Sequence, residues 1–135
     1  MIRLLIFILF LAATCYASDN HERGDSHRVV YTILDTDGNP VTGQTVNIKV
    51  QRVSDDSVYD FSDGLFKHSG WTTPLSTMTY NAGGEYYSRT FTPDAAINTV
   101  TEYVVIVSND DATYSDQQTQ TVRFGRTDDI VKIHR

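Results

Sequence analysis

Two pairs of adjacent aspartates are the metal-binding candidates of this sequence. Asp55-Asp56 and Asp110-Asp111 each fall in a turn between strand-like runs. Calcium takes several carboxylate and carbonyl oxygens as ligands, and loops cluster at the two ends of a β-sandwich. If the two pairs meet at one end, they form a calcium site. The alternative is that both pairs are solvated turns, the usual place for aspartate.

A third acidic stretch, Asp35-x-Asp37-x-Asn39, has the alternating oxygen ligands that begin a calcium loop. The rest of that loop is missing, because Pro40 stands where its glycine belongs and Val46 where its bidentate glutamate belongs. Asp, Gly, Asn and Pro are also the residues that β-turns require. The stretch therefore predicts a turn.

Other catalytic or metal patterns are absent from the sequence. The four histidines show no zinc spacing, and the chain has one cysteine, Cys15. There is no Gly-x-Ser-x-Gly and no glycine-rich phosphate loop. The sequence therefore predicts a protein that is not an enzyme and that has no cofactor apart from the calcium considered above.

Aromatic residues are the candidates for contact with a partner. Tyr86 and Tyr87 are adjacent in a strand-like run, so their side chains must point to opposite faces and one of them is expected to face solvent or a partner. Trp71 ends the strand-like run 65–71. Exposed aromatic rings are favoured at interfaces and stack on sugars. Packing in the core is the alternative for Trp71, Phe61 and Phe66.

The N-terminal segment has the features of an export signal. Arg3 precedes an apolar run, and small residues before Ser18 suit cleavage after Ala17, which predicts a signal peptide over residues 1–17. The apolar run is shorter than the roughly 20 residues that cross a bilayer. Cys15 leaves a second reading open, in which the cysteine carries lipid and anchors the chain to a membrane. Residues 18–26 are polar and predict a flexible leader.

From His27 to Gly125 the chain reads as one all-β domain. Val46, Ile48 and Val50 alternate with polar residues, the pattern of a half-buried strand. Similar short runs are expected at 27–34, 58–61, 65–71, 75–80, 85–92, 99–107 and 119–124. The continuously apolar 103–107 predicts a central strand covered on both faces. About seven to nine antiparallel strands with turns between them predict an immunoglobulin-like β-sandwich, followed by a tail at 126–135.

Net charge narrows the range of partners. The chain carries 17 acidic and 11 basic residues, a formal charge of −6, with no basic cluster. Binding to nucleic acid needs a patch of lysine and arginine that neutralises phosphates. The composition therefore excludes nucleic acid and leaves proteins or cell-surface glycans as the expected partners.

Two stretches carry a family resemblance. Residues 35–50, with the turn Asp-Thr-Asp-Gly-Asn-Pro, resemble the opening hairpin of bacterial Ig-like and transthyretin-like extracellular modules. Tyr59-Asp60-Phe61, Phe66 to Thr73 and Gly84 to Tyr87 resemble Ig-like proteins of tailed bacteriophages and related metagenomic sequences. This resemblance implies an Ig-like sandwich and a minor virion or tail-associated component.

These observations predict an exported, non-enzymatic Ig-like component with a structural or adhesive role. It would be secreted or displayed at a surface, in a virion-related or other extracellular assembly. A carbohydrate-binding module is the first alternative, because exposed Tyr and Trp rings stack on sugars. The second is a self-polymerising subunit, in which residues 18–26 add as a strand to a neighbour's open sheet edge.

Overall fold

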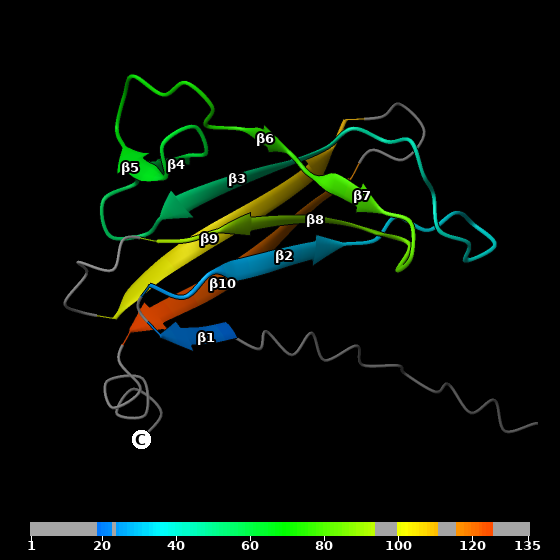
Figure 1. Ribbon diagram of the computed structural model, residues 1–135, viewed down its shortest axis with the longest axis horizontal. Helices are drawn as coiled ribbons and strands as arrows, with labels where there is room; N and C mark the ends of the chain where they lie inside the picture. The colour runs from blue at the N-terminus through cyan, green and yellow to red at the C-terminus, as the bar shows by residue number, and fades with distance from the viewer. Residues whose placement is uncertain (1–18, 23, 94–99, 111–115, 126–135) are drawn as a thin grey trace, which may run out of the picture.

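The computed structural model describes residues 19–22, 24–93, 100–110 and 116–125, and all regular elements in these ranges are strands (Figure 1). The predicted signal peptide, Cys15 and the tail at 126–135 lie outside the described residues. The strands are β1 (Asp19–Glu22), β2 (His27–Tyr31), β3 (Val46–Arg52), β4 (Val58–Asp60), β5 (Leu65–Lys67), β6 (Ser76–Thr77), β7 (Thr79–Asn81), β8 (Tyr86–Phe91), β9 (Thr101–Asn109) and β10 (Asp116–Gly125).

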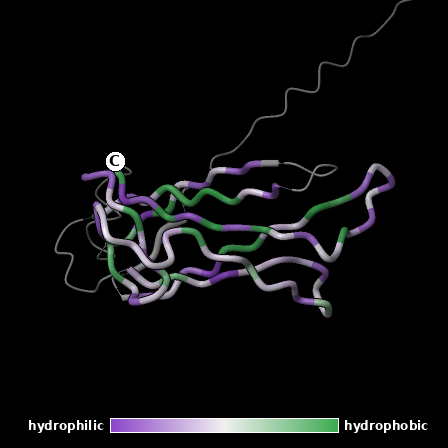
Figure 2. The backbone as a smooth tube through the Cα atoms, turned by 90° about the horizontal axis from the view of Figure 1, so that it is seen from above, coloured by the Kyte–Doolittle hydropathy of each residue, from purple (hydrophilic) through white to green (hydrophobic). Residues whose placement is uncertain are grey.

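The strands form two sheets, which fits the predicted β-sandwich. The larger sheet has the order β1-β10-β9-β3-β4-β5, with β6 also paired to β3, and the smaller has the order β2-β8-β7. All described pairings are antiparallel except that of β1 with β10. Seen from above, the tube alternates between hydrophobic and hydrophilic residues along its strands (Figure 2). In β2, β3 and β9 one side of the strand therefore contributes to the core.

The core lies between the sheets and is rich in aromatic rings. Val46, Ile48 and Val50 of β3 are fully buried, as the alternation predicted. Phe91 of β8 meets Tyr103 and Phe124 of the larger sheet edge-to-face, with ring centroids 6.2 and 5.9 Å apart. Each such ring pair stabilises the fold by about 0.5–1.5 kcal/mol beyond the free energy gained by burying the rings. Aromatic contacts therefore hold the two sheets together, and the described residues contain no disulfide.

The structure differs from expectation at β9. This strand lies between β10 and β3, so its central position is confirmed. Its burial alternates, however: Tyr103, Val105 and Val107 are buried, whereas Val104 and Ile106 are only half-buried. The prediction that both faces are covered is wrong, because the smaller sheet packs on one face of the larger sheet only.

Residues 75–80 were predicted as one strand and form two. Ser76 and Thr77 pair with Ile48 and Asn47 in the larger sheet, whereas Thr79 and Tyr80 pair with Ser88 and Tyr87 in the smaller one. The buried Met78 lies at the crossing and donates its N–H to the Val46 carbonyl, 2.7 Å away. This segment therefore closes one edge of the sandwich by passing between the layers (Figure 1).

The predicted leader contains a strand. Residues 19–22 pair in parallel with 122–125 of β10, from Asp19 opposite Val122 to Glu22 opposite Gly125. The self-polymerising alternative assumed that this segment adds as a strand to a neighbouring molecule. In the structure it adds to a sheet of its own chain instead. Composition did not indicate this strand, because its backbone pairing depends on an edge that only the folded sheet provides.

Candidate functional site

The two aspartate pairs lie at opposite ends of the larger sheet. Asp55 and Asp56 follow β3, and Asp110 follows β9. Because Arg52 pairs with Tyr103 and Val46 with Asn109, the end of β3 lies beside the start of β9. The seven residues of β3 therefore place Asp55 and Asp110 about 20 Å apart. The structure therefore does not bring Asp55 and Asp56 together with Asp110 at one calcium site, and Asp111 lies outside the described residues.

Asp55 instead organises its own turn. Its carboxylate accepts hydrogen bonds from Arg52 Nε at 2.8 Å, Arg52 Nη2 at 2.5 Å and Ser57 Oγ at 2.7 Å. The hydrogen bond from Arg52 holds the pKa of Asp55 well below its usual range. These donors use the lone pairs that a cation would need. The described residues contain no group of three or more His, Cys, Asp or Glu placed to hold a metal ion.

The stretch at 35–39 is a turn, as predicted. Asp35 Oδ1 accepts hydrogen bonds from the backbone N–H groups of Asp37 at 2.9 Å and Asn39 at 2.8 Å. Gly38 has a φ of +84°, a backbone conformation that glycine adopts without a steric penalty. The carboxylate of Asp35 therefore stabilises the hairpin end.

The adjacent tyrosines point to opposite faces, and Tyr87 is the one in the core. Only 2 % of Tyr87 is exposed, and its hydroxyl accepts a hydrogen bond from Gln44 N and donates one to Val41 O. Tyr87 is therefore removed from the predicted partner contacts, because its ring and hydroxyl are both occupied. Tyr86 is half-buried on the outer face of the smaller sheet, where Arg28 donates a hydrogen bond to its hydroxyl and lies over its ring.

Trp71 is the predicted partner residue that the structure leaves accessible. It is 39 % exposed and belongs to the loop between β5 and β6. Its indole Nε1 donates to the Lys67 carbonyl oxygen at 2.9 Å, so the polar atom is satisfied within the chain. The ring is thereby held in one orientation with part of its apolar surface in solvent. Phe61 and Phe66, in contrast, pack against the core.

A buried carboxylate holds the loop that carries Trp71. Asp60, at the end of β4, is fully buried and accepts backbone hydrogen bonds from Ser62, Thr72 and Thr73 at 3.0, 2.8 and 2.9 Å. Ser62 Oγ donates to it at 2.7 Å, and Lys67 Nζ lies 2.8 Å from it. Asp60 therefore holds residues on both sides of Trp71, namely Lys67 before it and Thr72 and Thr73 after it.

The ionisation of Asp60 follows from these contacts. Burial by itself would raise the pKa of this carboxyl group. The hydrogen bonds from Lys67, Thr72 and Ser62 outweigh burial and hold the pKa well below its usual range. Asp60 is therefore a charged structural centre, and the geometry of the Trp71 loop depends on that charge.

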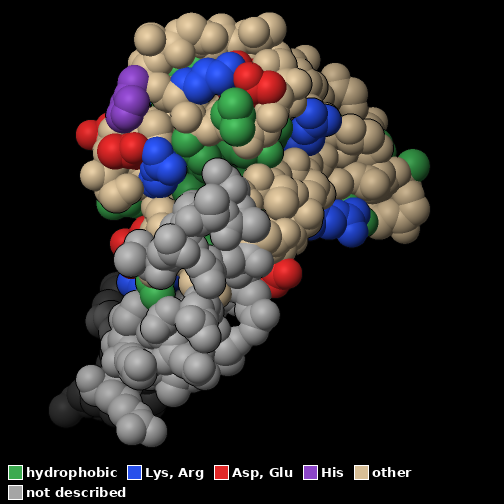
Figure 3. Space-filling view, turned by 60° about the vertical axis from the view of Figure 1, so that its left-hand side comes forward, with side chains coloured by type: hydrophobic (Ala, Val, Ile, Leu, Met, Phe, Trp, Pro, Cys, Tyr) green, Lys and Arg blue, Asp and Glu red, His purple; other side chains and the backbone are tan. Residues whose placement is uncertain are grey.

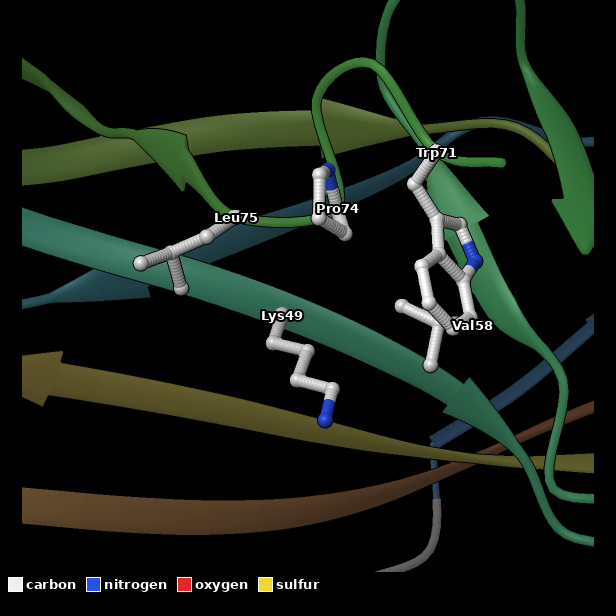
Figure 4. Close-up of a pocket in the computed structure, with 5 residues that line it drawn as sticks. All are labelled: Lys49, Val58, Trp71, Pro74 and Leu75. Atoms are coloured by element: carbon white, nitrogen blue, oxygen red, sulfur yellow. The ribbon is translucent and has the colours of Figure 1, made fainter. Parts of the chain in front are cut away.

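Trp71 forms one wall of a shallow pocket of about 310 Å³ (Figure 4). Pro74 and Leu75 of the same loop form a second wall, and Lys49 of β3 and Val58 of β4 form the base. Leu75 is 49 % exposed, whereas Val58 is buried beneath the loop. In the space-filling view, hydrophobic side chains gather on one face of the molecule between Lys, Arg, Asp and Glu side chains (Figure 3).

Strand register shows what surrounds the pocket on the larger sheet. Lys49 lies opposite Ile106, and Ile106 lies opposite Thr119. In the neighbouring row, Gln51 lies opposite both Val104 and Val58. Since alternate residues share a face, the half-buried Val104 and Ile106 extend the apolar surface beside Lys49. This outer face is the side of the larger sheet that the smaller sheet does not cover.

Lys49, Leu75 and Asp60 were not selected from the sequence. The alternation in β3 already placed Lys49 on the face opposite Val46, Ile48 and Val50. Asp60 had a weaker signal, because Asp-x-Ser is typical of a turn in which the carboxylate accepts local N–H groups. Nothing local linked Leu75 with Lys49, because a long loop brings them together.

Comparison with known proteins finds no match to a family model, a curated protein or a solved structure. Among the described residues, no helix has the length and apolar character needed to cross a membrane.

Proposed function

We propose that this chain is an exported, non-enzymatic immunoglobulin-like module that attaches to a protein partner through the Trp71 pocket. Its role would be structural or adhesive, in a virion-related or other extracellular assembly. The observation that carries the proposal is Trp71 itself, an exposed tryptophan held in place beside an apolar pocket. The arrangement of two packed sheets supports the immunoglobulin-like assignment.

The pocket has the properties of a preorganised binding site. Tryptophan is enriched among the residues that dominate interface energies. The hydrogen bond from Trp71 to Lys67 and the contacts of Asp60 immobilise the loop before any partner arrives. A site that is already ordered loses less conformational entropy on binding. This favours recognition by a fixed surface over folding of the loop around a ligand.

The pocket offers binding groups and no proton relay. Lys49 is the one ionisable residue that lines it, and the other lining side chains are apolar. General acid–base catalysis most often uses a histidine or a carboxylate positioned at the reacting atoms, and none of the lining residues is one. The composition of the pocket therefore supports a binding function in preference to a catalytic one.

A peptide-display selection tests the protein-binding proposal. Random peptides would be selected on the wild-type protein, and the affinity of the selected peptides would be measured for Trp71→Ala, Leu75→Gln and Tyr86→Ala. Loss of a central tryptophan costs about 2 kcal/mol or more, which is about 30-fold in Kd. We expect losses with Trp71→Ala and Leu75→Gln and none with Tyr86→Ala. Equal binding by all four folded proteins would contradict the proposed site.

Carbohydrate binding is the second candidate, favoured by the polar side chains on either side of Lys49 on the outer face of β3. Asn47 and Gln51 share the outer face of β3 with Lys49, and sugars combine stacking on aromatic rings with hydrogen bonds to such amides. Both amides already have partners, Thr77 for Asn47 and Asp56 for Gln51. A glycan array with Trp71→Ala as the control separates this candidate from the first.

A further inference from the structure

We propose that the Trp71 pocket takes a peptide segment in which a large apolar side chain stands next to a carboxylate, with the carboxylate on Lys49. This inference rests on the proposed protein-binding function and specifies the chemistry of the partner. It depends on the position of the Lys49 side chain in the pocket and on the fact that the carboxylates around it already have other partners.

The Lys49 side chain makes no hydrogen bond or ion pair with a described residue, whereas its backbone belongs to the ladder between β3 and β9. The carboxylates on neighbouring elements are used elsewhere: Glu102 accepts from Arg123 at 2.5 Å, and Asp60 pairs with Lys67 at 2.8 Å. Asp56 accepts from Gln51 at 3.1 Å. The chain has more acidic than basic residues, with a net charge of −6. A lysine amino group without a carboxylate partner is therefore unusual on this face.

The walls of the pocket determine the rest of the ligand. Trp71, Pro74, Leu75 and Val58 offer no free hydrogen-bonding side-chain group, because the indole N–H is bound to Lys67. A polar ligand would lose hydrogen bonds to water here without replacing them. An aliphatic or aromatic side chain gains by burial, about 25 cal/mol for each Å² removed from water. A volume of about 310 Å³ is at the small end for ligand pockets, which suits one such side chain.

Lys49 can contact both parts of the proposed ligand, the apolar side chain and the carboxylate. Its side chain is half-buried and lines the pocket, so its methylene groups contribute to the apolar surface. Its ammonium group points away from Pro74 and Leu75 (Figure 4). Figure 4 shows Lys49 lying between Leu75 on one side and Val58 with Trp71 on the other. A carboxylate directly beside the anchoring side chain can reach the ammonium, whereas one several residues away along an extended peptide cannot.

Small probes test this inference directly, because Trp71 is the one tryptophan of the chain and its fluorescence reports on the pocket. N-acetyl-leucine carries the apolar side chain and the carboxylate, and N-acetyl-leucinamide carries the same side chain without charge. Both would be titrated at millimolar concentrations, with glucuronate as a carboxylate on a sugar. We expect N-acetyl-leucine to bind about three- to fivefold more tightly than the amide, as for an ion pair near a protein surface.

Substitutions assign the difference to Lys49. Lys49→Gln should remove the preference for N-acetyl-leucine and leave the amide unchanged, and Lys49→Arg should restore it. Arg28→Gln, on the outer face of the smaller sheet, is the matched control and should have no effect. Raising the ionic strength should weaken only the charged probe.

The outcomes separate this inference from the proposed function. Equal binding of the acid and the amide, unaffected by Lys49→Gln, would overturn the carboxylate requirement and leave an apolar peptide site in place. Binding of glucuronate alone would overturn both and favour the carbohydrate candidate. If no probe changes the Trp71 emission while display-selected peptides still depend on Trp71, the specific pairing of side chain and carboxylate is refuted and the protein-binding function stands.

Discussion

Removing the hydroxyl group of Tyr87 should lower the stability of the domain and leave binding at the Trp71 pocket unchanged. In the wild-type structure this hydroxyl lies 3.0 Å from Gln44 N and 3.2 Å from Val41 O, so it joins β8 to the segment that precedes β3. Tyr87→Phe keeps the ring in the core and removes both hydrogen bonds. The substitution therefore isolates a hydrogen-bonding effect from a packing effect.

The expected size follows from the two groups left without a partner. A buried donor or acceptor that loses its hydrogen bond costs about 1–3 kcal/mol. These contacts are partly buried, so water can replace part of the loss, and we expect a decrease of about 1–2 kcal/mol in the free energy of unfolding. With a urea dependence of about 2 kcal/mol per M, the midpoint should fall by about 0.5–1 M.

Urea unfolding followed by circular dichroism measures this change, and Tyr80→Phe is the control. Tyr80 packs on Tyr87 with ring centroids 5.0 Å apart, yet its hydroxyl makes no hydrogen bond with a described residue. Its loss should change stability by less than about 0.5 kcal/mol. If Tyr87→Phe were as stable as Tyr80→Phe, the proposed role of the Tyr87 hydroxyl would be refuted. If Tyr87→Phe weakened peptide binding without lowering stability, Tyr87 would have to be counted among the residues that contact the partner.

Two further predictions concern the Asp60 centre and the leader strand. Asp60→Asn should lower the urea midpoint at pH 7 and weaken peptide binding, because the Trp71 loop loses its ion pair with Lys67. Since the pKa of Asp60 lies below its ordinary value of 3.8 in the folded state, its contribution is present above that pH and is lost as the pH falls further. Wild type should therefore lose more stability than Asp60→Asn between about pH 4 and pH 2, and parallel pH profiles would contradict this. For the leader, pairing of Asp19–Glu22 with β10 of the same chain predicts a monomer in size-exclusion chromatography. Multimers that disappear when residues 19–22 are deleted would instead indicate exchange of this strand between copies.

Local sequence patterns predicted the structure correctly where a single strand packs one of its faces against the core. The alternation in β3 and the turn chemistry at 35–39 predicted structures that the fold confirms, because both depend on neighbours within a few residues. The same alternation placed Tyr86 and Tyr87 on opposite faces. It could not say which face was the core, since register is set by the packing of the two sheets.

The site depended on contacts between distant parts of the chain. The sequence by itself placed Asp55 and Asp110 after strands, but the antiparallel pairing of β3 with β9 decided that they lie at opposite ends of the larger sheet. Trp71 was recognisable as a candidate from its residue type. Its exposure, and its position beside Lys49 and Leu75, required the Asp60 hydrogen bonds that fold the loop over the outer face of the larger sheet. Side-chain periodicity records burial along one strand, whereas a pocket is formed by several segments, and only tertiary packing brings those together.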